Sequence, residues 1–200
     1  METIKVKITL IDEMLGSLPN NQEVWETYIA KNAPDRKSLR EEIEMFGIDA
    51  TAEKTKTIFF RKDGEPVILD YQIRGQFKNA ASMLSKCQGT ESSKLKAFKK
   101  TVDGMVFVYP RTIKLNLPKN ITVGVCQRPL RASTPQGERV ALAFSETVPE
   151  GTWFDIEINY LPLIKNDLKK LILEWLDYGK LNGLGQWRNS GKGRFVYEIL

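Results

Sequence analysis

The sequence contains no histidine among its 200 residues. Histidine is the side chain that most often transfers protons near neutral pH, and it is also the commonest metal ligand in proteins. Its absence excludes Ser-His-Asp triads, Cys-His dyads, histidine-ligated zinc centres and histidine-dependent ribonuclease chemistry. Catalysis by this chain would need carboxylates with a metal ion, or lysine, tyrosine or serine side chains.

The sequence also lacks long hydrophobic runs and is poor in cysteine. No stretch is long and apolar enough to predict a membrane span, and the N-terminal METIKVKITLIDEM has no signal-peptide pattern. The two cysteines, Cys87 and Cys126, do not form a CxxC pair, and their separation alone does not predict a disulfide. We therefore expect a cytoplasmic protein without membrane contacts, and nothing in the sequence predicts a cofactor.

The composition is that of a globular protein with a mild excess of positive charge. Hydrophobic residues make up 42% of the chain and charged residues 28%, and 200 residues can bury an ordinary core. The net charge of +5 does not by itself predict nucleic-acid binding. Its distribution is more informative, because the cations are concentrated over residues 86–139 and 188–200.

The hydrophobic pattern predicts both strands and helices. Alternating apolar side chains predict strands over residues 3–11 and 152–161, and a 3.6-residue period predicts a helix over 163–178. An Asp-Gly pair at 63–64 predicts a hairpin turn. The other expected elements are helices over 22–32, 35–47 and within 70–84, strands over 57–60, 66–70, 105–109, 112–117 and 121–126, a loop over 15–21 and a turn over 148–151.

Without its insertions, the chain reads strand, helix, strand, strand, helix, strand. That order is typical of the α+β ferredoxin-like (RRM-like) fold, in which helices cover one face of an antiparallel sheet. We expect one domain over residues 1–200, with a helical insertion at about 19–60 and a β-hairpin extension at about 118–142.

The C-terminal LNGLGQWRNSGKGRFVYEIL contains four glycines within eleven residues. Glycines allow close approach of another chain, cations contact phosphate, and tryptophan stacks on a base. The spacing is neither a dinucleotide fingerprint nor a P-loop, because the glycines follow a helix and precede a strand. The alternative is a helix C-cap at Gly179 followed by a turn that binds nothing. The candidate binding residues are Gly185, Trp187, Arg188, Gly191, Lys192, Gly193 and Arg194.

Two further basic stretches carry candidate contacts. RPLRASTPQGER could be a hairpin that contacts a polyanion through Arg128 and Arg131, or a solvated hairpin without a ligand. DYQIRGQFK could hold a phosphate at a helix N-terminus beside Arg74 and Lys78, or could show ordinary helix capping.

An acidic run, EEIE at 41–44, is followed by Asp49 and Glu53. These carboxylates could ligate a metal ion. Their pattern is more typical of the solvated face of an amphipathic helix, so we expect no metal site.

The three basic stretches together resemble the RAMP superfamily of CRISPR-associated proteins. LGQWRNSGKGRFVYEI resembles the family's glycine-rich signature between its last helix and last strand. The family's segment that runs from a turn through a strand into a basic helix resembles RKDGEPVILDYQIRGQFKNAASML. Its hairpin that leads into a strand resembles RASTPQGERVALAFSETVPEGTWFDIEI. The matches occur in the family's order and cover residues 61–84 and 128–200. They are most similar to the backbone subunit that lines the guide RNA in multi-subunit effector complexes.

The resemblance implies a RAMP fold and non-catalytic binding of single-stranded nucleic acid, RNA in preference to DNA. It implies that Arg188, Lys192 and Arg194 contact phosphate while Trp187 stacks on a base. It also implies partners: further copies that assemble head-to-tail along the strand, or other RAMP-type proteins. A stand-alone version encoded by a prophage is one form that such a protein takes.

The sequence departs from the family pattern in several places. DYQIRG stands where the family has a small-residue GSSLKG segment, the histidine of guide-processing relatives is absent, and residues 19–60 have no counterpart. In some members an aspartate of that region cuts target RNA, but Asp49 cannot be aligned with it, so the role is not carried over.

Two other functions stay open from the sequence. The chain could be a phage or mobile-element protein that uses the fold to bind and regulate or inhibit a host complex. It could also be a histidine-independent endoribonuclease that uses Asp49 or a loop lysine. Nothing in the sequence predicts the reading of a particular base.

Overall fold

The computed structural model describes residues 1–19, 56–134 and 137–200. The helices expected over 22–32 and 35–47 lie outside these residues, and so does Asp49. The described residues form a mixed α+β fold with three α-helices and mainly antiparallel sheets.

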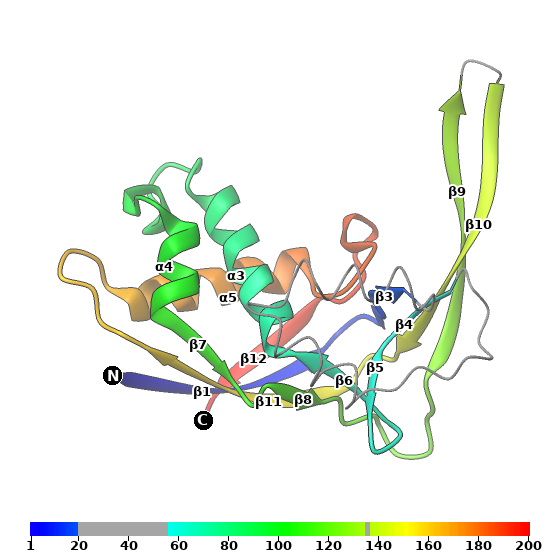
Figure 1. The fold of residues 1–200 in the computed structure, drawn as a ribbon, viewed down its shortest axis with the longest axis horizontal. Coiled ribbons are helices and arrows are strands. Elements are labelled where there is room, and N and C mark those ends of the chain that lie inside the picture. The colour runs from blue at the N-terminus through cyan, green and yellow to red at the C-terminus, as the bar shows by residue number, and fades with distance from the viewer. Residues whose placement is uncertain (20–55, 135–136) are drawn as a thin grey trace, which may run out of the picture.

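The central sheet contains four antiparallel strands in the order β12-β1-β11-β7 (Figure 1). Three of them match strands that alternation or composition predicts, and the fourth is the strand expected after the glycine-rich stretch. The strands are β1 (Glu2–Leu10), β7 (Val106–Tyr109), β11 (Trp153–Tyr160) and β12 (Phe195–Ile199).

One face of the central sheet forms the floor of the core. In the register of β1 and β11, Val6 lies opposite Ile156 and Ile8 lies opposite Phe154, and all four side chains are buried. Lys5, which precedes Val6, is exposed because successive side chains of a strand point to opposite faces. The alternating sequence of β1 therefore gives the sheet an apolar face and a polar face.

Three helices cover the apolar face (Figure 1): α3 (Asp70–Leu84), α4 (Phe98–Met105) and α5 (Leu168–Asn182). Phe77 of α3 and Trp175 of α5 are fully buried, with their ring centroids 5.8 Å apart. Gln76 Nε2 donates a hydrogen bond of 3.1 Å to the Trp175 carbonyl, which fixes α3 against α5.

None of the helices in the described part of the chain has the length and apolar character needed to cross a bilayer.

The last helix, α5, begins and ends later than the sequence predicts. It starts at Leu168 because the carboxylate of Asp167 accepts a hydrogen bond from the Lys170 N–H and caps the helix. Ile164, which has the right spacing for the apolar stripe, lies before the helix and is fully exposed. The prediction of a helix from residue 163 is therefore wrong at its start.

The predicted C-cap at Gly179 is also wrong. Gly179 lies inside α5, and a Cβ atom there would be 2.6 Å from Cζ of Phe195. Glycine at this position lets β12 pack closely under the helix. The helix ends instead at Gly183, whose positive φ of 76° is a conformation that glycine adopts readily.

Helix α4 is not predicted from the sequence. Its eight residues, FKKTVDGM, include only a few apolar side chains, which is too short a pattern to recognise. The fold stabilises it through the fully buried Val102 and through an ion pair of 2.6 Å between Lys78 Nζ on α3 and Asp103.

A second sheet leads into a long hairpin that projects from the molecule (Figure 1). Its order is β2-β10-β4-β3, and β9 pairs with β10. The expected loop over 15–21 includes parts of two short strands, because Gly16 allows close approach: a Cβ there would be 2.5 Å from the Ile58 carbonyl carbon. The strands are β2 (Met14–Leu15), β3 (Leu18–Pro19), β4 (Lys56–Ile58), β9 (Gly124–Thr134) and β10 (Gly137–Val148).

A third, small sheet precedes α3. Its strands are β5 (Phe60–Lys62), β6 (Glu65–Leu69) and β8 (Thr112–Lys114), in the order β5-β6-β8. The turn between β5 and β6 is the predicted Asp-Gly pair, and both Asp63 and Gly64 have positive φ. Two 3-10 turns, η1 (Ser92–Lys94) and η2 (Arg188–Ser190), complete the described elements.

Candidate nucleic-acid interface

The glycine-rich loop, residues 183–194, joins α5 to β12 and is tied to the segment that follows β1. Leu184 N–H donates to the Gly193 carbonyl at 2.9 Å, and Gly193 N–H donates to the Glu13 carbonyl at 2.8 Å. Ile11 N–H donates to the Arg194 carbonyl at 2.9 Å. These backbone bonds hold the loop as a defined part of the fold.

The glycines of the loop serve close packing within the chain. A Cβ at Gly193 would be 1.9 Å from the Leu184 carbonyl oxygen, and one at Gly185 would be 2.5 Å from the Leu15 carbonyl oxygen. At Gly191 the nearest atom to an added Cβ is 3.7 Å away, in the Arg194 side chain. Gly185 and Gly193 therefore shape the loop, and we assign them no direct contact with a ligand.

Two of the three loop cations are already paired with carboxylates. Lys192 Nζ pairs with Glu13, and Arg194 Nε pairs with Asp12 Oδ2 at 2.7 Å. Both acids belong to the segment after β1, so these pairs reinforce the backbone bonds of the loop. A phosphate would have to compete with the carboxylates for Lys192 and Arg194.

Arg188 differs from the other two loop cations. It is half-buried, and its side chain forms no ion pair or hydrogen bond within the described residues. It lies next to Trp187, whose φ of 54° turns the chain sharply before η2. Its charge is therefore available to an anionic ligand.

Trp187 contacts the hairpin through Arg128 of β9. The guanidinium carbon lies 5.0 Å from the centre of the Trp187 ring, and Nη2 donates to Gln186 Oε1 at 3.1 Å. Nε and Nη1 of Arg128 are buried and donate no hydrogen bond within the described part of the chain. The structure thus brings Arg128, Trp187 and Arg188 together from two stretches that the sequence predicts separately.

A cavity of about 570 Å³ opens between α3, α5 and this loop. Carboxamide side chains from all three elements meet in it beside the indole and the free guanidinium. Its polar and aromatic lining includes Asn79, Asn182, Gln186, Trp187, Arg188 and Asn189.

The asparagines of this cavity are absent from the sequence-based candidates. A lone asparagine on a helix has no motif around it, and Asn79 and Asn182 are more than a hundred residues apart. Only the contact between α3 and α5 places them at one site.

Arg74 and Lys78 lie on another side of α3. Arg74 Nη2 pairs with Asp70 Oδ2 at 3.1 Å, and Asp70 also pairs with Arg111. Positions 74 and 78 share one face of the helix, whereas position 79 lies about 100° further round. The structure therefore does not bring these two cations to the cavity.

The N-terminus of α3 is capped within the chain. Leu69 N–H donates to Gln72 Oε1 at 2.8 Å, and Asp70 N–H donates to the Arg111 carbonyl at 3.0 Å. These bonds agree with the ordinary capping that the sequence allows as an alternative to phosphate binding.

Arg131 lies further along β9, where its backbone pairs with Val140 of β10. It belongs to the projecting arm of the hairpin, beyond the point at which Arg128 contacts the loop. Its contact with a nucleic-acid strand stays a prediction.

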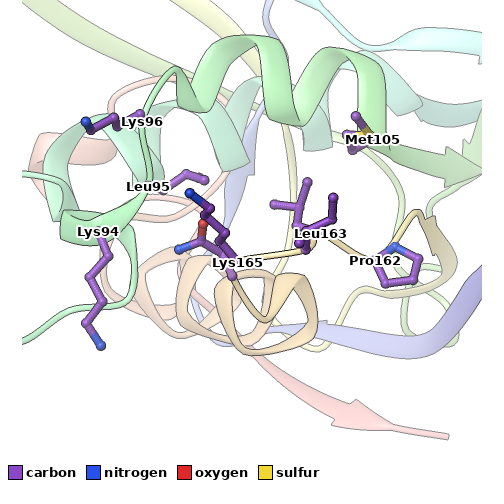
Figure 2. Close-up of a pocket in the computed structure, with 9 residues that line it drawn as sticks. Lys94, Leu95, Lys96, Met105, Pro162, Leu163 and Lys165 are labelled. Carbon is purple, nitrogen blue, oxygen red and sulfur yellow. The ribbon is translucent and has the colours of Figure 1, made fainter.

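A second cavity, of about 790 Å³, lies where η1 and α4 meet the segment before α5 (Figure 2). Its apolar lining includes Leu95, Met105 and Leu163, and three lysines surround it: Lys94, Lys96 and Lys165.

One wall of this second cavity is held firmly by α5. Glu174 accepts hydrogen bonds from the N–H groups of Glu91 and Ser92 at 2.8 and 2.9 Å. Trp175 Nε1 donates to Ser92 Oγ at 2.9 Å. The η1 turn is therefore a fixed part of the fold.

Comparison with known proteins gives a fold likeness and no sequence match. No protein-family model and no curated protein matches this chain. A chain of the type III-B Cmr-beta complex, solved by cryo-EM bound to cognate target RNA, is 15% identical with a TM-score of 0.54, over 99% of this chain. A chain of a type IV-B CRISPR complex is 12% identical with a TM-score of 0.50, over 100% of this chain and 90% of that one.

This chain spans 60% of the length of the Cmr-beta chain that it matches. Because the sequence identities are this low, the comparison is informative about the fold alone. It shows that the chain has a fold found in subunits of CRISPR complexes.

Proposed function

We propose that this protein binds single-stranded nucleic acid, RNA in preference to DNA, without cleaving it, and that its fold is the ferredoxin-like fold of the RAMP superfamily. The strand would lie across the glycine-rich loop, with Arg188 on phosphate and Trp187 against a base.

The order of the central strands supports the fold assignment. Apart from the short α4, the elements that build the central sheet and cover it follow each other as β1, α3, β7, β11, α5 and β12, and the sheet order is β12-β1-β11-β7. In the ferredoxin-like pattern the last strand likewise lies beside the first, and the two middle strands form a hairpin. The fold likeness to chains of two CRISPR complexes, one of them bound to RNA, points the same way.

The observation that carries the function is the gathering of Arg128, Trp187 and Arg188 beside a cavity. Aromatic rings and cations are the usual partners of unpaired bases and of the phosphates between them. Arg128 lies over the indole and fixes its orientation, and Arg188 supplies a charge with no carboxylate partner among the described residues.

The other predicted cations receive different roles. We assign Lys192 and Arg194 to holding the loop in place, since both pair with acids after β1. Arg74 pairs with Asp70 within α3, and Lys78 holds α3 to Asp103 of α4, so we give them no direct contact with the strand. Arg131 is kept as a contact from the hairpin arm.

Fluorescence anisotropy with 12-nucleotide RNA and DNA at low and moderate salt tests this proposal. Wild type should bind in a salt-sensitive way, and Arg188→Ala should weaken binding to every strand and lower the salt slope by about one ion. Lys114→Ala, which removes an exposed cation from β8, serves as the matched control and should change little. Intact RNA on a denaturing gel after incubation is also expected.

Failure of folded wild-type protein to bind either strand at low salt would contradict the proposal. Equal losses in Arg188→Ala and Lys114→Ala would contradict the placement of the strand at the loop, because non-specific attraction to a basic protein would then explain the binding.

A protein-binding role is the second candidate, and the lysine-surrounded cavity favours it (Figure 2). Lys96 and Lys165 are exposed beside an apolar floor that includes Leu163. Such a site suits an acidic segment of a partner protein that inserts one apolar side chain.

Labelled peptides that place one leucine among glutamates test this second candidate. Wild type should bind them, and the double variant Lys96→Glu, Lys165→Glu should not. Binding that survives the charge reversal would contradict the candidate, and peptides with lysine in place of glutamate provide the matched control.

A further inference from the structure

The cavity beside the glycine-rich loop brings several carboxamide groups to one place. Asn79 comes from α3, Asn182 from the last turn of α5, and Gln186 and Asn189 from the loop. Arg188 is the only charged side chain among the described residues that line it. A carboxamide offers a hydrogen-bond donor and an acceptor side by side. The cavity therefore presents a neutral, two-way hydrogen-bonding surface next to one cation.

These carboxamides are largely without partners in the fold. Nδ2 of Asn182 is buried and donates no hydrogen bond, and the side chains of Asn79 and Asn189 form none within the described residues. A buried amide donor without a partner destabilises a protein, because it has given up its hydrogen bonds to water and gained none in the fold. The terminal torsion of asparagine is soft, so the amide of Asn182 can rotate to meet a ligand in the cavity that its residue lines. A ligand that accepts this hydrogen bond would remove the cost.

The third element of the cavity is the indole of Trp187. Arg128 lies over the ring, and the ring also lines the cavity. A flat ligand in the cavity could stack on the indole while its edge meets the carboxamides. A volume of about 570 Å³ lies within the range of sites that hold small ligands.

We infer that this cavity receives one unstacked nucleobase of the bound strand and distinguishes between bases. Trp187 would stack on the base, Asn79 and Asn182 would pair with its edge, and Arg188 would hold the adjoining phosphate. The inference rests on the proposed strand binding and adds base selection to it.

Adenine is the base that the lining favours. One asparagine carboxamide pairs with adenine in a bidentate way, because it accepts from N6 and donates to N7. As a purine, adenine also offers a larger ring face than cytosine or uracil for stacking on Trp187.

Anisotropy titrations with A12, U12 and C12 RNA strands and with a strand of twelve abasic residues test the inference. Wild type should bind A12 at least about fivefold more tightly than U12 or C12, and the abasic strand most weakly. Asn182→Ala and Asn79→Ala should each lower the affinity for A12 to about the affinity for U12. Gln88→Ala, at an exposed turn, is the matched control and should keep the preference for A12.

The readout separates base selection from strand binding. Arg188→Ala should lower the affinity for A12, U12 and C12 by the same factor, because phosphate contacts carry no information about the base. Thermal unfolding of each variant checks that the loop remains folded. Asn79→Ala keeps the test valid if Asn182→Ala disturbs the end of α5.

Three outcomes would overturn the inference. Equal binding of A12, U12, C12 and the abasic strand would contradict a base site while leaving strand binding intact. If the preference for A12 survives both asparagine substitutions, the base site does not lie in this cavity. A preference for U12 or C12 would contradict the adenine assignment. Absence of binding to all four strands would instead contradict the proposed function itself.

Discussion

At the scale of single residues, the distinction that matters is between cations with and without a carboxylate partner. Lys192 and Arg194 carry the charge that makes the loop conspicuous in the sequence, yet Glu13 and Asp12 neutralise both. Arg188 has no such partner among the described residues. Counting basic residues therefore overstates the number of phosphate contacts that the loop can make.

Substitution of Glu13 by glutamine tests whether Lys192 is held back from phosphate by its ion pair. Glu13→Gln keeps a hydrogen-bond acceptor near Lys192 but removes the competing charge. We expect RNA affinity to rise by a few fold and the salt slope to increase by about one ion, measured by anisotropy. Glu198→Gln on β12 is a control for the change in net charge. Unchanged binding in Glu13→Gln would contradict the competition.

Two tyrosines of the described residues, with hydroxyls bonded to carboxylates, predict a loss of stability at high pH. Burial, helped by the charge of Asp177, raises the pKa of Tyr197 to about 12, and burial also raises the pKa of Tyr160 above its usual range. The folded state therefore retains these protons at a pH where the unfolded chain loses them. The stabilisation is fully present below about pH 10 and is lost as pH rises toward 12.

Chemical denaturation at pH 9, 10 and 11 measures this dependence. The free energy of unfolding should fall with pH, and the fall should be shallower in Tyr197→Phe. If the free energy of unfolding falls with pH equally steeply in wild type and in Tyr197→Phe, Tyr197 does not contribute to the pH dependence.

At the scale of elements, two helical glycines should respond in opposite ways to alanine. Gly75 lies in the interior of α3 with no atom within 4 Å of an added Cβ, whereas at Gly179 of α5 the Cβ would be 2.6 Å from Phe195. Gly75→Ala should stabilise the protein by about 0.5–1 kcal/mol. Gly179→Ala should destabilise it by about 1–3 kcal/mol through overpacking. Urea unfolding measures both, and effects of the same sign would contradict the packing described for α5 and β12.

The loop glycines give a second matched pair. Gly193→Ala places a Cβ 1.9 Å from a carbonyl oxygen, so we expect the loop to shift and RNA binding to be lost. Gly191→Ala meets no close atom and costs about 1–2 kcal/mol from its positive φ alone. Binding by Gly191→Ala should stay within a few fold of wild type. Normal binding by Gly193→Ala would show that the loop geometry is not needed.

The elements with long, regular patterns are those that the sequence predicts well. The alternation of Ile4, Val6 and Ile8 predicts β1, and the Asp-Gly pair predicts the turn between β5 and β6. The start of α5 is not predictable from periodicity, because Ile164 has helical spacing but lies before the cap at Asp167. Helix α4 is missed because its stability comes from contacts with the rest of the fold.

The candidate site is predicted in part. The glycine-rich sequence predicts a loop with an aromatic and a cationic residue, and the structure places Trp187 and Arg188 there beside a cavity. The contact with Arg128 and the contribution of Asn79 and Asn182 depend on how β9, α3 and α5 meet. No local pattern carries that information.

At the scale of the whole molecule, two surfaces compete as the place where a strand would bind. The glycine-rich loop and its cavity lie at one end of α5, and the polar face of the central sheet lies on the side away from the helices (Figure 1). RRM domains bind RNA on the sheet face, through aromatic side chains that stack on bases. In this protein that face carries Trp153 beneath Lys7 Nζ, 4.7 Å from the ring centre. We nevertheless place the strand at the loop, because Arg188 and the cavity lie there.

Photo-crosslinking of a strand containing 4-thiouridine, with the adducts located by mass spectrometry, tests this placement most directly. Binding at the loop predicts crosslinks to Trp187 and its neighbours in residues 183–194, together with β9 near Arg128. Crosslinks confined to Trp153 and the other strands of the central sheet would contradict it.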